Sequence, residues 1–199
     1  MQAKSAHWSE VETRDLDSPK VYPNPDVLGV PPELVPKILP LEYWPSNILH
    51  ETCEDVVEFD TDLKQLIYDM AYTMHRRNGI GLAAPQVGKL LNIIIVETRT
   101  LIPMINPRII ESDEKYTYSM EEGCLSVPGY YEKRTRPQRV VVKYQKSNGI
   151  EKQTEFQGMS AFLVQHEIDH LNGKIFVDDL SNLKKDRVKK KMKKTLRGI

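Results

Sequence analysis

The chain has 199 residues, a formal net charge of zero at pH 7, 40% hydrophobic residues and 28% charged residues. This length suits one domain that buries a core without help from disulfides or a structural metal. The balanced charge gives no general reason to expect binding to DNA or to a membrane. No apolar run approaches the roughly 20 residues of a membrane span. The two cysteines, Cys53 and Cys124, are a weak sign of secretion, so a reducing compartment is favoured.

The N-terminal region does not resemble a targeting signal. It lacks the basic and then apolar order of a secretory signal, and it contains acids that are unusual in transit peptides, such as Glu10 and Asp15. We therefore expect a cytoplasmic protein and leave an organellar location open. Residues 1–37 are polar and rich in proline, which predicts an irregular N-terminal extension that wraps on the domain or stays mobile.

The first strong periodic pattern begins at Asp60. Apolar residues then recur at the spacing that places them on one face of a helix, and the pattern stops before Asn78-Gly79. We predict an amphipathic helix here, with its apolar face formed by Leu63, Leu66, Ile67, Met70, Ala71 and Met74.

Short segments rich in β-branched residues follow this helix. Residues 91–97 (LNIIIVE) have the length and composition of a buried strand. The tripeptide Ser147-Asn148-Gly149 separates two further segments and is a strong hairpin signal. The other predicted strands cover residues 104–110, 116–120, 139–145 and 150–156.

Two helices are predicted after the strands. The first carries His166-Glu167-x-x-His170, and the second is a basic helix over residues 183–199. The basic helix has a thin apolar stripe formed by Leu183, Val188, Met192 and Leu196. This order of elements predicts an α+β fold in which antiparallel sheets pack around the His-bearing helix. We place this domain at residues 38–182.

The His166-Glu167-x-x-His170 pattern predicts a metal site. Positions i and i+4 share one face of a helix, so both imidazoles can reach one cation. Glu167 is rotated about 100° from His166 and can face the open coordination position as a base. Such a pattern also arises by chance on protein surfaces. Here a buried helix is favoured, because the motif lies among Phe162, Leu163, Val164, Ile168 and Leu171, with Ser160 as a candidate N-cap.

Two histidines leave a catalytic metal one protein ligand short, because such sites usually have three. The candidates downstream of His170 are Asp178, Asp179 and Asp186. The candidate upstream is Cys124, within residues 122–129 (EGCLSVPG). A third segment, residues 79–88 (GIGLAAPQVG), is spaced by glycines but lacks the ending of a phosphate-binding loop.

Together, residues 79–88, 122–129 and 166–170 resemble the three signature motifs of the peptide deformylases. The resemblance spans roughly residues 38–180, and the motifs occur in the family's order. Deformylases remove the formyl group from the N-terminal methionine of nascent polypeptides and release formate. The resemblance therefore implies that residues 38–182 form a metal-dependent catalytic domain acting in protein biosynthesis. One departure is Ser46, where the family usually has aspartate, and it lies outside the active site.

The resemblance also implies a role for each residue that matches the motifs. The metal ligands are Cys124, His166 and His170, which hold one Fe²⁺ per chain, with Zn²⁺, Ni²⁺ or Co²⁺ able to substitute. Glu167 is the general base and then the acid, while the Gln86 side chain and the Leu125 backbone N–H donate to the oxyanion. Gly81 lines the site where the substrate strand binds, and an apolar methionine pocket is expected from Ile80, Phe162 and Leu163.

Two other functions stay open at this point. A metallopeptidase could use the same pair of histidines, although no suitable third ligand follows His170. A noncatalytic ribosome-associated module could keep a metal only for folding, but such a site would not require a base at Glu167. The basic C-terminal helix, with Lys189-Lys190-Lys191, is usually a solvated face and here is also a candidate for docking on the ribosome.

Overall fold

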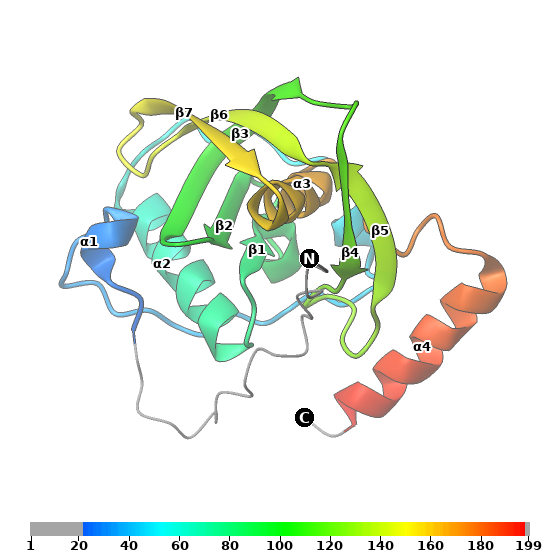
Figure 1. The fold of residues 1–199 in the computed structure, drawn as a ribbon. Coiled ribbons are helices and arrows are strands. Elements are labelled where there is room, and N and C mark those ends of the chain that lie inside the picture. Colours follow the sequence, from blue (N-terminus) through cyan, green and yellow to red (C-terminus); the bar gives the residue numbers. More distant parts are fainter. Residues whose placement is uncertain (1–21, 198–199) are drawn as a thin grey trace.

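The structure is a computed structural model that describes residues 22–197. Two antiparallel sheets and a central helix form its framework (Figure 1). The helical elements are α1 (Pro25–Leu28), η2 (Asn47–His50), α2 (Thr61–Arg76), η3 (Ala84–Val87), α3 (Met159–Leu171) and α4 (Asn182–Leu196). The strands are β1 (Gly81–Ala83), β2 (Ile93–Glu97), β3 (Leu101–Ser112), β4 (Thr117–Glu122), β5 (Glu132–Pro137), β6 (Arg139–Gln145) and β7 (Glu151–Gln157). The predicted α+β class is confirmed.

The larger sheet has five strands in the order β1-β2-β3-β6-β7, and β4 pairs with β5 in a separate sheet. The predicted hairpin is β6-β7, in which Val140 pairs with Phe156 and Gln145 with Glu151. Alternate residues of β6 point inward, as a half-buried strand requires. The sequence pattern did not indicate β5, because Glu132–Pro137 (EKRTRP) is charged and carries no apolar alternation.

The helix α2 follows the predicted pattern. The Asp60 side chain caps its start by accepting a 2.8 Å hydrogen bond from the Leu63 backbone N–H. Two buried polar residues on this helix hold a distant segment of the chain. Asp69 Oδ1 accepts from the Lys37 N–H at 2.7 Å, and Thr73 Oγ1 accepts from the Leu39 N–H at 2.9 Å.

The predicted N-terminal extension lies outside the described residues as far as residue 21. From Tyr22 onward the chain packs on the domain, because Leu28 and Val30 are buried in the same core cluster as α2. The hydroxyl of Ser147, in the β6-β7 turn, donates to the backbone oxygens of Leu28 and Gly29. Residues 22–37 therefore contribute to the core of the fold.

The helix α3 lies in the middle of the molecule and is buried on nearly every side (Figure 1). Leu163, Val164, Ile168 and Leu171 pack in a cluster with buried residues of β2, β3, β6 and β7. The helix begins at Met159, after Gly158 in the left-handed region with φ of 57°. The prediction that Ser160 caps this helix is therefore wrong, since the helix has already begun there.

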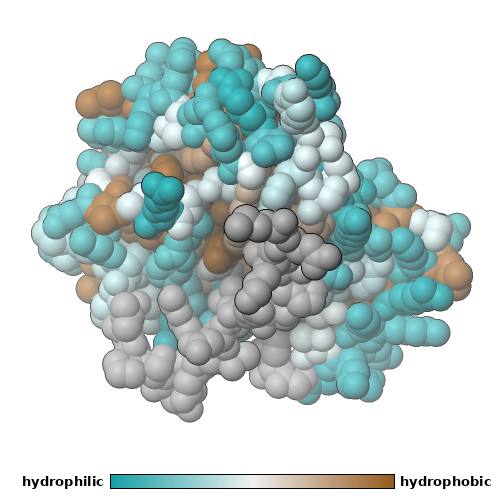
Figure 2. Space-filling model, in the orientation of Figure 1, coloured by the Kyte–Doolittle hydropathy of each residue, from teal (hydrophilic) through white to brown (hydrophobic). Residues whose placement is uncertain are grey.

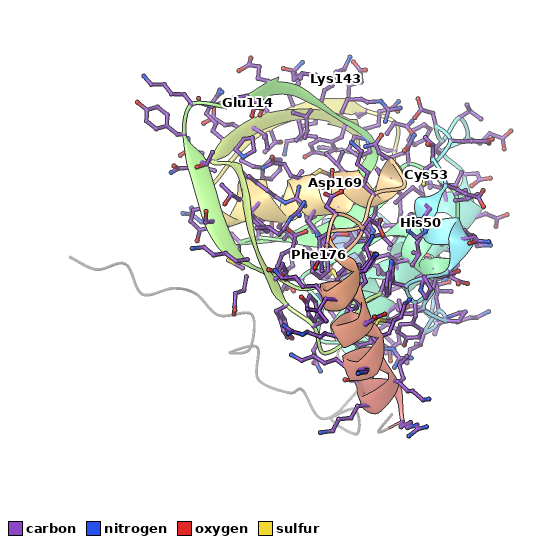
Figure 3. All side chains as sticks on the ribbon, turned by 90° about the vertical axis from the view of Figure 1, so that its right-hand side faces the viewer. His50, Cys53, Glu114, Lys143, Asp169 and Phe176 are labelled. Atoms are coloured by element: carbon purple, nitrogen blue, oxygen red, sulfur yellow. The ribbon has the colours of Figure 1, made fainter. Side chains whose placement is uncertain are left out.

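The helix α4 covers the loop that follows β4. Val188 and Met192 are buried against Trp44, Tyr130 and Phe176. The predicted apolar stripe is narrower than expected, because Leu183 is 66% exposed and Leu196 is 37% exposed. The view in Figure 3 shows Phe176 above the start of this helix and Asp169 on α3. None of the helices in residues 22–197 is long and apolar enough to cross a membrane.

Candidate metal centre and substrate cleft

The helix α3 presents two histidines on one face, one turn apart. The ring centroids of His166 and His170 lie 4.8 Å apart, and the ring planes are nearly perpendicular. Both side chains are buried. Neutral imidazoles in this arrangement can direct one nitrogen each toward a shared point.

Cys124 joins the two histidines from the loop after β4. Its Sγ lies 3.2 Å from His170 Nε2. The donor atoms of Cys124, His166 and His170 all lie within 4.8 Å of one another, and within residues 22–197 no other group of three such residues converges in this way. The aspartates considered as alternative ligands lie elsewhere: Asp178 accepts from the Trp44 indole N–H, Asp179 pairs with Arg134, and Asp186 lies 4.0 Å from Lys189.

The orientation of His166 is set by a buried carboxylate. His166 Nδ1 donates to Glu122 Oε1 at 2.6 Å, so its Nε2 lone pair is available to a cation. Glu122 also accepts two hydrogen bonds from Arg136, and Arg136 in turn donates to Asp169 at 2.7 Å. These residues form one continuous network from β4 and β5 to α3.

The network shifts several protonation equilibria. Burial alone would raise the pKa of Glu122, but the charges and hydrogen bonds of His166 and Arg136 lower it to about 2. Burial lowers the pKa of His166, yet the Glu122 charge and the hydrogen bonds to Cys124 and Glu122 raise it well above its usual value. Burial and then the charge of His166 lower the pKa of His170 well below its usual value. In the metal-free protein, His166 therefore holds a second ring proton more readily than His170 does.

Glu167 faces the backbone of the first motif. A Cβ at Gly81 would collide with Glu167 Oε1 and would lie 2.8 Å from Leu163 Cδ1, so a side chain at this position would displace Glu167 or Leu163. Glu167 Oε2 is buried and has no hydrogen-bond partner in the described part of the chain. Burial, more than any neighbouring charge, raises the pKa of Glu167 to about 7 in the metal-free protein.

Gln86 is held beside the thiol of Cys124. Its Oε1 accepts from the Ala83 backbone N–H at 2.7 Å, which fixes the direction of the amide. Its Nε2 then lies 3.2 Å from Cys124 Sγ and 3.1 Å from Ser126 Oγ. The predicted donor is therefore part of the same centre as the predicted ligands.

A cavity of about 450 Å³ opens over this centre. Seven of the site residues predicted from the sequence line this cavity: Ile80, Gly81, Gln86, Cys124, Leu125, His166 and Glu167. The apolar part of its wall also includes Leu41, Tyr43, Val127 and Tyr130, none of which the sequence indicated. These wall residues come from segments before α2 and after β4.

Comparison with known proteins agrees with this geometry. The polypeptide deformylase family model matches residues 38–186. The chain belongs to this family. It is 43% identical over 162 residues to a peptide deformylase of Thermodesulfovibrio yellowstonii, covering 78% of this chain and 97% of the relative. It is 44% identical over 161 residues to a peptide deformylase of Chromobacterium violaceum, covering 79% and 95%. The crystal structure of a peptide deformylase from Legionella pneumophila has a TM-score of 0.76 at 39% identity, covering 81% of this chain and 96% of that one.

Polypeptide deformylases depend on a metal, and the donors found here suit one. A thiolate and two imidazoles form a donor set that binds transition metals such as zinc or iron. The hydrogen bond from His166 Nδ1 to Glu122 is the partner that a metal-binding histidine usually has. The residues present therefore fit a metal centre.

Phe162 and Leu163 occupy a different position from the one predicted for this deformylase. Both are buried, and neither lines the cavity. The Arg136 guanidinium lies over the ring of Phe162, with its Cζ atom 5.2 Å from the ring centroid. Leu163 packs behind Gly81. Because a helical pattern shows which residues are buried but not what they contact, the sequence could not separate core positions from cavity positions.

Sequence reasoning also missed Glu122 and Arg136. Glu122 stands two residues before Cys124, and its place at the start of the second motif was a signal that it contacts the metal ligands. Arg136 lies in β5, the strand that has no apolar pattern. Only the pairing of β4 with β5, in which Glu122 is opposite Glu132 and Tyr118 opposite Arg136, brings Arg136 toward α3.

Proposed function

We propose that this protein is a metal-dependent hydrolase that removes the formyl group from the N-terminal formyl-methionine of nascent polypeptides and releases formate. One observation carries the proposal: the carboxylate of Glu167 lines the same cavity as Cys124 and His166, and one of its oxygens is buried with no partner among residues 22–197. A metal site that served only folding would not need such a base.

We assign the metal ligands as Cys124, His166 and His170. When bound, the cation supplies Lewis-acid activation of water at neutral pH. Glu167 accepts the proton of the attacking water and returns it to the nitrogen of the leaving amine. The position of Glu167 beside Gly81 supports this role, because the substrate backbone can approach closely only where no side chain intervenes.

The oxyanion that forms on the formyl carbon requires hydrogen-bond donors. We assign these to the Gln86 side chain and the Leu125 backbone N–H, since both residues line the cavity next to Cys124. The hydrogen bond from the Ala83 N–H to Gln86 Oε1 holds the amide with its NH₂ group toward the centre. Losing one such donor typically raises the barrier by about 3 kcal/mol.

The substrate is expected to bind as an extended strand beside β1. This strand is at the edge of its sheet and pairs only with β2 within the described residues. An extended peptide can therefore add to its other edge through main-chain hydrogen bonds. Ile80 and Leu125 supply apolar surface for the methionine side chain, and Leu163 supports this wall from behind Gly81.

We propose Fe²⁺ as the native metal, with Zn²⁺, Ni²⁺ or Co²⁺ as functional replacements. The donor set supports any of these ions, because thiolate and imidazole ligands suit each of them. Metal analysis of protein purified without oxygen distinguishes between them. Cys124→Ser should lower the metal content, and equal metal content in this variant and the parent would contradict the assignment of Cys124.

We further propose that the deformylase acts in the cytoplasm, or in an organelle that synthesises protein, and that α4 contacts the ribosome. In support, basic side chains on α4 are exposed, among them Arg187, Lys190, Lys193 and Lys194. Figure 2 shows a mostly hydrophilic surface over this helix, at the lower right of the view. Basic surfaces of this kind bind the phosphates of RNA with a strong dependence on salt.

The deciding experiment compares the deacylation of formyl-Met-Ala, measured as released formate, with that of acetyl-Met-Ala, measured as released acetate. We expect turnover of the formyl peptide alone, because a cavity wall close to Glu167 leaves little room for a larger acyl group. Cleavage of the Met-Ala bond instead would favour a metallopeptidase. No release of formate by metal-loaded protein would overturn the proposed function.

A further inference from the structure

The end of α2 brings two polar residues to the rim of the substrate cavity. Arg77 is the C-cap residue of this helix, and Asn78 follows it in the left-handed region with φ of 56°. Both residues line the cavity that contains Cys124 and Glu167. Arg77 is the one lysine or arginine among the residues that line it.

Both side chains have buried polar atoms that no described residue satisfies. Arg77 Nε is a buried donor without an acceptor, and Asn78 Oδ1 is a buried acceptor without a donor. None of the ion pairs within residues 22–197 involves Arg77, whereas Arg108, Arg134, Arg136 and Arg139 all pair with acids. Buried polar atoms of folded proteins nearly always have a partner, so these two atoms point to a ligand.

The distance between Arg77 and the residues around Glu167 determines which part of a bound peptide Arg77 can contact. Gly81 lies beside Glu167, and Gly79 lies beside Leu125. The Cα atom of Arg77 lies four residues before that of Gly81 and is therefore at most about 14 Å from it. An extended peptide rises about 3.3 Å per residue. A substrate whose formyl-methionine lies at Gly81, and which runs back toward α2, reaches Arg77 with its third or fourth residue.

We propose that Arg77 and Asn78 form a subsite that binds a carboxylate of the substrate at its third or fourth residue. This inference rests on the proposed deformylase function. Arg77 donates to the carboxylate, for which a planar guanidinium is well suited. Asn78 Oδ1 accepts a backbone N–H of the same extended peptide. The deformylase therefore favours nascent chains that are acidic close to the formyl-methionine.

The carboxylate has two sources in a peptide, and both can be tested. One pair of substrates is formyl-Met-Ala-Glu-amide and formyl-Met-Ala-Gln-amide, which differ only in a side-chain charge. The other pair is formyl-Met-Ala-Ala with a free carboxylate and with a C-terminal amide. We expect kcat/KM about tenfold higher for at least one acidic peptide over its neutral partner, mainly through a lower KM, as for other charge-assisted hydrogen bonds.

Variants separate the subsite from general attraction. Arg77→Gln should bring the acidic-to-neutral ratio of kcat/KM close to one, and Arg77→Lys should keep part of the preference. Asn78→Asp should also lower the ratio, since it places a carboxylate next to Arg77. The matched control is Arg99→Gln, which removes the same positive charge. Arg99 is exposed and lies outside the cavity. This control should keep the parent ratio.

The outcomes distinguish the subsite from the function on which it rests. Absence of formate release from every peptide would overturn the proposed function itself. Deformylation without a preference in either pair would overturn only the subsite. A preference that survives Arg77→Gln would also overturn the subsite. A preference that Arg99→Gln removes to the same extent as Arg77→Gln would overturn it as well.

Discussion

The two helices of the C-terminal half have similar lengths and opposite surroundings (Figure 1). In α3 most residues are buried, including His166, Glu167 and His170, whereas in α4 only Val188 and Met192 are buried. In α3, His166 and Asp169 are in contact with charged partners from β4 and β5, while most charges of α4 face solvent. The comparison shows that the surroundings of a charged side chain, rather than the number of charges on its helix, determine how strongly that side chain affects stability.

The energies differ accordingly. Removing one partner from a buried ion pair leaves an uncompensated charge in a medium of low dielectric and typically costs about 3 to 5 kcal/mol. An ion pair in solvent, such as Lys189 with Asp186, usually contributes about 1 kcal/mol or less. Substitutions in α3 should therefore change chemistry or stability strongly, and those in α4 should do so only where the side chain is buried.

The largest effect is expected on catalysis from Glu167 in α3. Glu167→Gln keeps the shape of the side chain but cannot accept a proton, so kcat should fall by about 100-fold to 10,000-fold. Metal content should stay the same, because Glu167 is not assigned as a ligand. Formate release and metal analysis on the same sample check both points. Near-normal turnover would show that another group is the base.

The next effect is expected on stability, from Glu122 beneath α3. Glu122→Gln should lower the free energy of unfolding of the metal-free protein by about 3 kcal/mol at pH 7, because Arg136 and His166 lose their buried counter-charge. The pKa of Glu122 is lowered from 4.5 to about 2, so its stabilising charge is fully present above pH 4.5 and lost as the pH falls toward 2.

The difference between parent and Glu122→Gln should therefore shrink below pH 4.5. Urea unfolding of both proteins between pH 3 and pH 7 measures it. Glu155→Gln is a suitable control, since Glu155 also pairs with an arginine, Arg139, but is exposed on the sheet. A difference that stays constant with pH would mean that the lost stability does not come from the charge.

A smaller effect is expected where α4 contacts the rest of the molecule. Met192→Ala should lower the free energy of unfolding by about 2 kcal/mol, since Met192 is 4% exposed and removing its side chain leaves a cavity beside Trp44 and Tyr130. Leu183→Ala removes a side chain that is 66% exposed and should change stability by less than about 0.5 kcal/mol. Equal losses in the two variants would contradict the packing described here.

The smallest effect on the isolated enzyme is expected from the exposed lysines of α4. The double variant Lys193→Gln and Lys194→Gln should change the free energy of unfolding by less than about 0.5 kcal/mol and leave kcat/KM for formyl-Met-Ala unchanged. Its binding to ribosomes should weaken, and the salt dependence of that binding should become less steep. Co-sedimentation at several salt concentrations tests this, and unchanged binding would contradict a role for these lysines.

The sequence by itself determined the features that depend on local pattern. The 3.6-residue period predicted α2 and placed His166 and His170 on one face of a helix. The turn Ser147-Asn148-Gly149 predicted the β6-β7 hairpin, and the three motifs identified the family. Each of these features depends on residues that are near one another in the chain, so composition and spacing were sufficient.

Tertiary structure alone decided the rest. Spacing along the chain left Cys124 and the downstream aspartates as alternatives, and only the family resemblance favoured Cys124. The structure brings Cys124 Sγ to 3.2 Å from His170 Nε2, across 46 positions of sequence. The charged strand β5 exists because β4 pairs with it, and that pairing carries Arg136 to Glu122. The cavity wall combines Leu41, Ile80 and Tyr130 from separate segments. Contacts between distant segments form through burial and shape, which the order of residues along the chain does not display.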